Sequence, residues 1–231
     1  MLVKSQQDLL ALLDNILREP QQFWEEFYKD KYKPIPFFVN KPDENLVDYI
    51  ENKQLQPKKV LEFGCGAGRN AIYLARQGCS VVGVDISENA LQWAKERAES
   101  ENLNIEFMHS NIFDLSLEEN SFDLIYDSGC FHHIAPHRRI TYLTNIHKYL
   151  KANGHFALCC FQEKGVYGGS AISDEEVYSK RSLEGGLGYS SEKLQDIFQS
   201  LNRVEIRKMI EMKEEDPYFG LDGFLVGLFK K

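Results

Sequence analysis

The sequence lacks the features that mark secreted, membrane-spanning and metal-binding proteins. No apolar run approaches the roughly 20 residues that a membrane-spanning helix needs, and Asp14 and Asn15 interrupt the leucines near the N-terminus, so no signal peptide is expected. The five cysteines show neither CxxC spacing nor the histidine pairing of a zinc site. We therefore expect reduced thiols, no bound metal, no membrane contact and a cytoplasmic location.

An excess of basic charge is also absent. The 231 residues have a net charge of −8, with 27 Lys and Arg against 35 Asp and Glu, and both signs are interspersed along the chain. Because nucleic acids require a basic face, this distribution argues against a nucleic-acid partner, although one local patch could still bind RNA. A small molecule is the expected partner, and a monomer and a homodimer both stay open.

Short apolar strands alternate with helices from residue 59 onward. Near-continuous apolar strands joined by helical crossovers predict an α/β fold, with a doubly wound, mostly parallel sheet covered by helices on both faces. The expected strands are 59–63, 80–85, 105–109, 122–126 and 155–161, and the expected helices are 69–77, 88–100 with Ser87 as N-cap, and 137–150 with Ile140, Leu143, Ile146 and Leu150 directed inward.

The two ends of the chain depart from this alternation. Residues 1–56 are expected to form an N-terminal helical lid segment, and 57–231 the main domain. The stretch 165–188 is polar and rich in glycine, which predicts a loop or insertion over the strand ends. Further helices are expected at 6–18, ended by Pro20, and at 21–30, 44–53 and 191–201, and final strands at 203–210 and 223–230.

The most informative stretch is the glycine-rich turn after the first core strand. Gly64, Gly66 and Gly68 follow the strand 59–63 and precede a helix. Glycines permit a tight turn and the close approach of a ligand, and the free N–H groups of the helix point at the same place. Asp85 ends the next strand, where a carboxylate can bind both hydroxyls of a ribose. The pattern predicts a nucleotide-sized pocket, although three glycines could also form only a tight turn.

Two classes of cofactor use this geometry, and Glu62 distinguishes them. Dinucleotide enzymes require GxGxxG around a pyrophosphate, whereas this chain has GxGxG with an acidic residue two positions before the first glycine. A carboxylate there repels a pyrophosphate and suits an ammonium group. The run 60–70, VLEFGCGAGRN, resembles the first motif of the class I S-adenosylmethionine-dependent methyltransferases, (V/I)L(D/E)xGCGxG. A nicotinamide-dependent oxidoreductase stays an alternative, which the glycine spacing and Glu62 oppose.

The resemblance implies a seven-stranded sheet whose last strand is antiparallel, and S-adenosylmethionine as the cofactor. Glu62, the loop backbone and the residues after the fourth strand would hold the methionine moiety. Asp85 would hold the ribose, with Ile86 against one adenine face. Asn111 would accept a hydrogen bond from the adenine amino group, at a position where the family more often has Asp. Cys65 would line the glycine loop, although it also suits a small packing position. The expected cofactor residues are Glu62, Gly64, Cys65, Gly66, Gly68, Asn70, Asp85, Ile86, Asn111, Ile112, Asp127 and Ser128.

Two adjacent histidines follow the fourth strand, where the substrate should meet the methyl group. His132 or His133 could act as a general base, because imidazole titrates near neutrality. Each could equally make a structural hydrogen bond, and methyl transfer to a soft nucleophile needs no base. Enzymes that methylate DNA bases and glutamine carry (N/D)PP(Y/F) at this place, whereas 127–130 here is DSGC. The sequence therefore argues against that class of substrate.

Five aromatic residues precede the core strands and are suited to a lid: Trp24, Phe27, Tyr28, Phe37 and Phe38. A lid excludes water and can place an aromatic face on a sulfonium, whereas the alternative is a helix that only covers the sheet. Their order, together with GCGxGRNAxYLA at 64–75, resembles the thiopurine, tellurite and halide methyltransferases. We expect a methyltransferase acting on a small thiol, chalcogen, amine or similar acceptor by in-line displacement. A noncatalytic cofactor-binding sensor or partner protein is the alternative.

Overall fold

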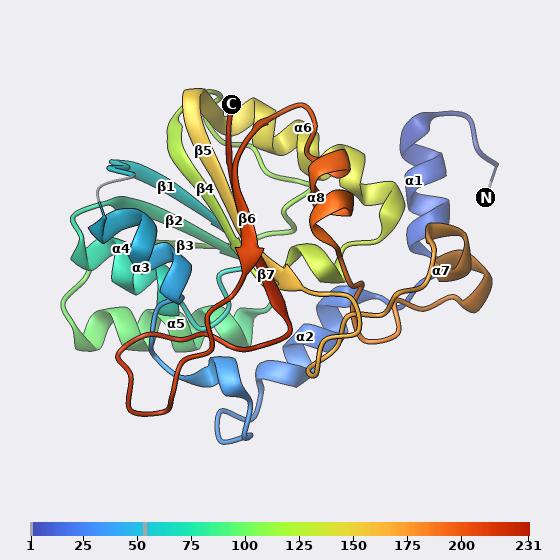
Figure 1. Ribbon diagram of the computed structural model, residues 1–231. Coiled ribbons are helices and arrows are strands. Elements are labelled where there is room, and N and C mark those ends of the chain that lie inside the picture. The colour runs from blue at the N-terminus through green and yellow to red at the C-terminus, as the bar shows by residue number, and fades with distance from the viewer. Residues whose placement is uncertain (1, 53–54) are drawn as a thin grey trace.

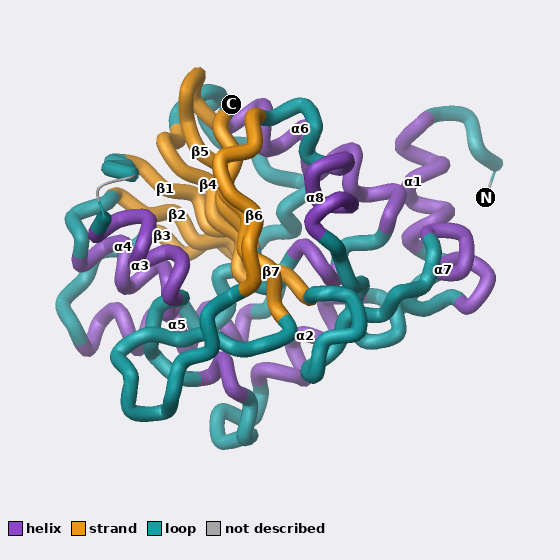
Figure 2. Tube along the Cα trace, viewed as in Figure 1, coloured by secondary structure: helices purple, strands orange, loops and turns teal. Residues whose placement is uncertain are grey.

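The computed structural model describes residues 2–52 and 55–231. A seven-stranded sheet lies at its centre, in the order β3-β2-β1-β4-β5-β7-β6, and helices cover both faces (Figures 1 and 2). The strands are β1 (Lys59–Phe63), β2 (Ser80–Asp85), β3 (Glu106–His109), β4 (Phe122–Ser128), β5 (Leu150–Phe161), β6 (Asn202–Lys208) and β7 (Phe224–Lys230).

Six strands run in one direction, and β7 lies antiparallel between β5 and β6. The expected α/β fold with an antiparallel last strand is therefore confirmed. β1 lies inside the sheet, where Phe63 is paired with Val84 of β2 on one side and with Asp127 of β4 on the other. β2 and β3 lie on one side of β1, whereas β4 and the later strands lie on the other side. Open α/β sheets bind their ligands at such a switch point, beside the carboxyl ends of the strands.

Two hydrophobic clusters attach the helices to the sheet. On one face, α3 (Glu44–Glu51) and α4 (Arg69–Arg76) pack against the sheet, with α5 (Glu88–Ser100) beside them. On the other face lie α6 (Arg139–Tyr149) and α8 (Ser191–Ile197) (Figure 1). Apolar side chains of β1 are buried on both faces, and the strand is apolar except for Lys59 at its start and the buried Glu62.

The expected inward face of α6 is wrong at Ile140, and Leu150, which was expected to end this helix, is instead the first residue of β5. Tyr142, Ile146 and Tyr149 are fully buried, whereas Ile140 is 65% exposed. α6 begins at Arg139, because Pro136 starts a separate 3-10 turn, η3 (Pro136–Arg138). At about 100° per residue, a position six residues before Ile146 is rotated by about 240° from it, so Ile140 faces away from the sheet.

The N-terminal helices are shorter than expected. α1 (Gln6–Asp14) ends well before Pro20, which is instead the first residue of α2 (Pro20–Tyr28). Proline is favoured at that position because its missing N–H would have no partner there. Glu19 caps α2 by accepting the N–H groups of its first turn. α3 ends at Glu51, so the end predicted at Lys53 lies outside the described residues.

The glycine-rich stretch 165–188 contains a helix that the sequence argument missed, α7 (Asp174–Lys180). Ser173 and Glu176 form a reciprocal capping box at its start, a signal readable in the sequence as Ser-x-x-Glu. α7 lies beside α1 (Figure 1), and the His137 ring joins the two helices, with Tyr178 Oη and Asp14 Oδ1 each 2.8 Å from one ring nitrogen.

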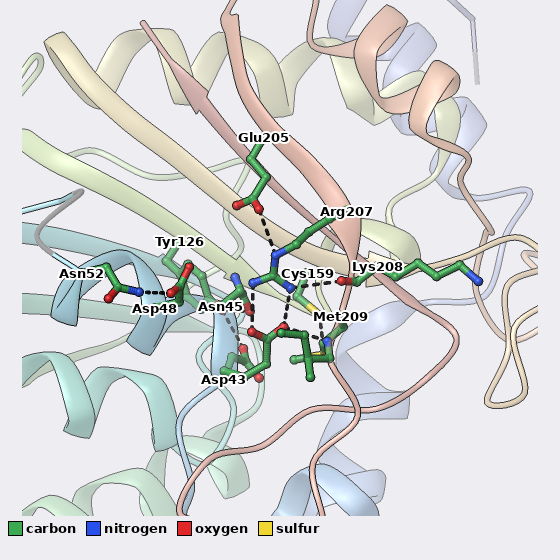
Figure 3. A network of polar contacts seen from close by, with 12 residues as sticks. Asp43, Asn45, Asp48, Asn52, Tyr126, Cys159, Glu205, Arg207, Lys208 and Met209 are labelled. Atoms are coloured by element: carbon green, nitrogen blue, oxygen red, sulfur yellow. Dashed lines mark hydrogen bonds and ion pairs between the residues drawn. The ribbon is translucent and has the colours of Figure 1, made fainter.

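A polar network connects α3 to the last strands (Figure 3). Arg207 of β6 donates two hydrogen bonds to the carboxylate of Glu44, at 2.7 and 2.9 Å. Tyr126 of β4 donates to Asp43 at 2.7 Å. Residues on both sides of the predicted boundary at residue 56 thus share one packed core, and the division into 1–56 and 57–231 stays a prediction. No described helix is long and apolar enough to cross a bilayer.

Candidate functional site

The glycine loop between β1 and α4 is anchored to the end of β2. Cys65 N–H donates to Val84 O at 3.0 Å, and Gly66 N–H donates to Asp85 Oδ2 at 2.8 Å. Gly66 has φ of +53°, a conformation that glycine adopts without the steric cost of a Cβ. The loop therefore lies at the carboxyl edge of the sheet, beside the switch point between β1 and β4.

The expected lid residue Tyr28 reaches this loop directly. A Cβ placed on Gly66 would lie 2.6 Å from Tyr28 Oη, and one on Gly64 would lie 2.7 Å from Cys130 Cβ. The glycine loop is therefore bordered on one side by Tyr28 of α2 and on the other by Cys130 in the turn after β4. Both glycines are needed for this close approach, since a methyl group does not fit at either position.

Glu62 is a buried carboxylate with an unused oxygen. The residue is 1% exposed, and Oε2 has no hydrogen-bond partner among the described residues. Burial raises the pKa of Glu62 to about 8, an effect that the nearby Arg69 guanidinium only partly offsets. A buried carboxylate without a partner is costly, and an ammonium group at Oε2 would remove that cost. This is the position at which the sequence predicted the amino group of a methionine moiety.

Asp85 has a role that sequence reasoning missed. Besides Gly66, it accepts the N–H of Ser87 through Oδ1 at 2.9 Å, and burial raises its pKa. Each carboxylate oxygen can accept two hydrogen bonds, so a ribose can bind while both backbone bonds persist. Ser87 caps α5 by accepting Ala90 N–H at 3.1 Å, as expected.

The expected adenine contacts lie in the turn after β3. Asn111 Oδ1 accepts the N–H of Phe113 at 3.0 Å, which leaves one lone pair on this oxygen. The carbonyl of Ile112 accepts Asn145 Nδ2–H at 2.6 Å, and Ile86 O lies 3.0 Å from His109 Nε2. Asn145, a buried residue of α6, thus positions this turn and was not predicted, because nothing in its neighbourhood along the chain marks it.

Asp127 and Ser128 end β4 and have different surroundings. Asp127 is fully buried, and its oxygens accept Cys130 N–H at 2.9 Å, Phe131 N–H at 3.2 Å and Tyr142 Oη–H at 2.6 Å. Burial raises the pKa of Asp127 to about 7, although the three hydrogen bonds favour the ionised form and so act in the opposite direction. Ser128 Oγ accepts from the Arg69 guanidinium at 2.9 Å. Asp127 therefore shapes the turn that follows β4.

Asn70, another expected cofactor residue, belongs to a structural network. Its Oδ1 accepts Asp43 N–H at 2.9 Å, and its Nδ2 donates to Asp43 Oδ2 at 3.0 Å. Arg69 completes this network with an ion pair to Asp43 Oδ1 at 2.6 Å. The first turn of α4 is thereby tied to the start of α3. Cys65 is buried, and its Sγ would be 3.0 Å from a Cβ at Gly83, so it packs against β2.

The two histidines lie in the turn η2 (Phe131–His133) after β4. His132 is 3% exposed, and its Nδ1 accepts Phe161 N–H at 3.2 Å. Burial, with a smaller contribution from His133, lowers the pKa of His132 well below its ordinary value. Burial also lowers the pKa of His133 to about 4. Both imidazoles are therefore neutral at physiological pH, and both are weak bases.

The five aromatic residues of the expected lid form one cluster with α5. Tyr28 stacks on Phe38 with ring centroids 5.5 Å apart, and Phe38 meets Trp93 of α5 edge-on at 5.0 Å. Trp24 meets the His133 ring edge-on at 4.9 Å. The remaining members of the cluster are Phe27 and Phe37. The cluster reaches the glycine loop at one end and the histidine turn at the other.

Two charged residues, Glu25 and Arg97, make the polar contacts that hold this cluster in place. Glu25 of α2 accepts from Ser87 Oγ at 2.5 Å and from Asn89 N–H at 3.2 Å, at the start of α5. The guanidinium of Arg97 donates to Phe38 O at 2.5 Å and to Ala67 O at 3.2 Å. Arg97 thus connects the expected lid segment to the glycine loop. Neither Glu25 nor Arg97 was predicted, since both look like ordinary helix-surface charges.

Comparisons with known proteins relate the chain to one family. A family model described as a methyltransferase domain matches residues 60–154. An uncharacterized methyltransferase of Schizosaccharomyces pombe is 35% identical over 106 residues, 46% of this chain and 73% of that protein. The probable S-adenosyl-L-methionine-dependent methyltransferase TehB of Haemophilus influenzae is 33% identical over 103 residues, 45% of this chain and 36% of that protein. The chain thus spans about a third of the length of TehB.

A solved structure agrees in fold. The chain is similar to the Burkholderia thailandensis 1,6-didemethyltoxoflavin-N1-methyltransferase, a complex with 1,6-didemethyltoxoflavin and S-adenosylhomocysteine, with a TM-score of 0.68. The alignment covers 100% of this chain and 92% of that chain at 20% identity. At this identity, the likeness shows the fold alone.

Proposed function

This chain belongs to the class I S-adenosylmethionine-dependent methyltransferases, and we propose that it transfers the methyl group of that cofactor to a small-molecule acceptor. The observation that carries the proposal is the buried, unpartnered Oε2 of Glu62 at the switch point of the sheet. An ammonium group beside a sulfonium suits such an oxygen because it favours the ionised carboxylate, whereas a pyrophosphate would oppose the ionisation of Glu62. A cytoplasmic location stays part of the proposal, and so does the lack of a nucleic-acid partner, which the net charge of −8 supports.

The residues of the site fit the cofactor in three groups. Glu62 and the backbone of the glycine loop would hold the methionine moiety, with Ser128 at its far end. Asp85 would hold the ribose through the lone pairs that Gly66 and Ser87 leave unused. The adenine contacts would be Ile86, Asn111 and Ile112.

When bound, the cofactor supplies a methyl group made electrophilic by the positive charge on its sulfur. The contribution of the protein would be alignment and exclusion of water. In-line transfer needs the acceptor about 3 Å from the methyl carbon, and this positioning accounts for much of the acceleration. Tyr28 and Trp24 of α2 cover the two ends of the site, so the lid would have to open for the cofactor to enter and close before transfer.

A noncatalytic cofactor-binding protein is a second candidate. The observation that favours it is the state of the two histidines, since neither has a pKa near neutrality and no other base was predicted. Transfer to an acceptor that has already lost its proton would reconcile this observation with catalysis. The two candidates differ in a single measurable quantity, which is turnover.

The test has a binding step and a turnover step. Thermal unfolding is compared with S-adenosylhomocysteine and with NAD, and only the former should raise the melting temperature. Release of S-adenosylhomocysteine is then measured against thiols, halides and small amines, with Glu62→Gln as the matched control. Binding without turnover for any acceptor would favour the noncatalytic candidate. A melting temperature raised by NAD, or equal turnover by the Glu62→Gln variant, would overturn the cofactor assignment.

A further inference from the structure

The His132 ring is held from three directions. Its Nδ1 accepts Phe161 N–H at 3.2 Å, its face stacks on the Phe161 ring with centroids 3.8 Å apart, and the His133 ring lies at 4.3 Å. The turn itself is fixed to the glycine-rich stretch, because Leu187 N–H donates to His132 O at 2.7 Å. The ring therefore cannot rotate without breaking buried contacts on both sides.

The hydrogen bond at Nδ1 determines where the proton of the ring is. A ring nitrogen that accepts an N–H carries no hydrogen, and in a neutral imidazole the other nitrogen then carries it. Burial keeps the ring neutral, since the pKa of His132 is well below its ordinary value. His132 thus has a hydrogen on Nε2, and this nitrogen donates a hydrogen bond; it has no lone pair with which to remove a proton from a substrate.

Nε2 faces the junction between the end of β4 and the glycine-rich stretch. The two carbons beside it, Cε1 and Cδ2, are the ring atoms nearest to Gly129 and Gly186, whose ideal Cβ positions would lie 3.7 and 3.2 Å away. Neither residue has a Cβ, so no Cβ at Gly129 narrows this junction, whereas the Phe161 ring already closes the Gly186 side, with carbons that would lie 2.9 and 3.0 Å from a Cβ there. Across 2–52 and 55–231, the only hydrogen bond found at the His132 ring is the one at Nδ1.

The neighbours of this junction relate it to methyl transfer. Gly129 directly follows Ser128, the residue placed at the end of the methionine moiety. The far wall comes from 165–188, which is closed on itself by Gly188 N–H to Ser170 O at 2.7 Å, and the next residue, Tyr189, donates its N–H to Phe161 O of β5 at 2.9 Å. Trp24 of the lid meets the adjacent His133 ring. The Nε2–H group of His132 therefore lies where three segments meet: the proposed lid, the proposed cofactor site after β4, and the glycine-rich stretch 165–188.

We propose that His132 binds and orients the methyl acceptor through a fixed Nε2–H donor, and that it is not the general base. The contact with the acceptor rests on the proposed methyl-transfer function, whereas the position of the proton does not. Such a donor selects acceptors that present a lone pair, such as a thiolate, a carbonyl oxygen or a ring nitrogen. For a thiolate, its lone pair forms the new bond to the methyl carbon while the electron pair of the broken bond stays on the cofactor sulfur, so no proton moves.

The proton is located by two-bond ¹H–¹⁵N correlation spectra of the ¹⁵N-labelled full chain between pH 5.5 and 8.5. The His132→Asn variant identifies the signal. We expect a bare Nδ1 and a protonated Nε2 throughout, with S-adenosylhomocysteine bound or absent. A hydrogen on Nδ1, or a charged ring anywhere in this range, would overturn the proposal whether or not the chain is an enzyme.

The contact is tested with thiophenol, which is an anion near neutral pH. Adding it to the S-adenosylhomocysteine complex should shift the Nε2–H resonance, and an unchanged resonance under saturating thiophenol contradicts the contact. In turnover, His132→Asn keeps an oxygen for Phe161 N–H but loses the donor, so KM should rise about tenfold with kcat within threefold. His132→Gln, whose amide can reach the Nε2 position, should recover part of this loss, and His147→Asn should have no effect.

A general base would give a different result. Its loss lowers kcat by about 10²–10⁴ and removes the acidic limb of the pH–rate profile, so either outcome in His132→Asn rejects the proposal. If the wild-type chain turns over no acceptor, the proposed function fails, while the spectra still decide the proton position and the thiophenol contact.

Discussion

Replacing Glu62 by Gln should change the pH dependence of stability in a direction fixed by the structure. Burial raises the pKa of this carboxyl from 4.5 to about 8. Between these two values the folded chain keeps a proton that the unfolded chain has lost, so the free energy of unfolding falls as pH rises. The slope is about 1.4 kcal/mol per pH unit, and Glu62 alone should therefore lower stability by about 3 kcal/mol between pH 5 and pH 7.5.

The assay is urea unfolding of the wild type and Glu62→Gln without cofactor at several pH values from 5 to 7.5. The buried amide of Gln adds a cost that does not depend on pH, so the difference in slope, and not the offset, measures the ionisation of Glu62. The exposed Glu175, changed to Gln, is the control and should leave the slope unaltered. Parallel curves for wild type and Glu62→Gln would show that Glu62 ionises as easily when folded as when unfolded, which contradicts the reasoning.

The same variant tests the cofactor contact. Glu62 must ionise to pair with an ammonium group, so binding of S-adenosylhomocysteine at pH 7 should release close to one proton from a group whose pKa is about 8. Calorimetry in buffers of different ionisation enthalpy measures this release. In Glu62→Gln the release should disappear and affinity should fall about 10- to 100-fold, because a charge-assisted hydrogen bond is lost. Unchanged affinity would place the ammonium elsewhere.

Three further substitutions test the surroundings of the site. Asp85→Ala removes the acceptor of two backbone N–H groups, so it should lower the free energy of unfolding by about 3 kcal/mol and also weaken binding of the ribose. Urea unfolding measures the first loss and calorimetry the second. An unchanged unfolding curve would refute the role of Asp85 in anchoring the glycine loop. Gly66→Ala should lower the free energy of unfolding by about 2 kcal/mol or more, because of backbone strain at φ of +53° and the clash with Tyr28 Oη. Adding Tyr28→Phe should remove the clash and restore part of this stability, while the backbone strain persists. If the effects of the two substitutions were simply additive, Gly66 and Tyr28 would not be in contact. Tyr142→Phe removes a hydrogen-bond donor to ionised Asp127, so the pKa of Asp127 should rise above about 7. The free energy of unfolding at pH 8 should then fall by about 1–3 kcal/mol. An unchanged urea midpoint at pH 8 would contradict this role of Tyr142.

The sequence predicted the sheet well because each core strand is a short apolar run that no helix pattern matches. It also located the glycine loop and Asp85, since a positive φ demands glycine and a strand end is easily recognised. The burial of Ile140 was mispredicted because this residue lies about 240° around α6 from the buried Ile146. α7 was missed because glycines flank it, although its capping box is present in the sequence.

The parts of the site that could not be predicted are contacts between distant segments. Arg97 holds Phe38 and Ala67 together, and Asn145 holds the turn at Ile112. Each is one polar residue on an otherwise ordinary helix, and its partner is set by tertiary packing. The tautomer of His132 is a further example, because it depends on a backbone N–H of β5 that lies far along the chain.

Glu62 and Asp127 are both buried, and their hydrogen bonds distinguish the proposed cofactor contact from a residue that holds a turn. Both end neighbouring strands, both are buried, and both were expected to hold the methionine moiety. Asp127 has three donors within 3.2 Å, which compensate for burial and fix the turn that carries the histidines. Glu62 has an oxygen with no hydrogen-bond partner among the residues that the structure describes, and it has the higher pKa of the two, about 8 against about 7. A chain that keeps such an uncompensated carboxylate at a ligand-binding edge loses stability unless a cation binds there, so Glu62 is the better candidate for the cofactor contact, and Asp127→Asn should reduce stability more than it reduces cofactor affinity.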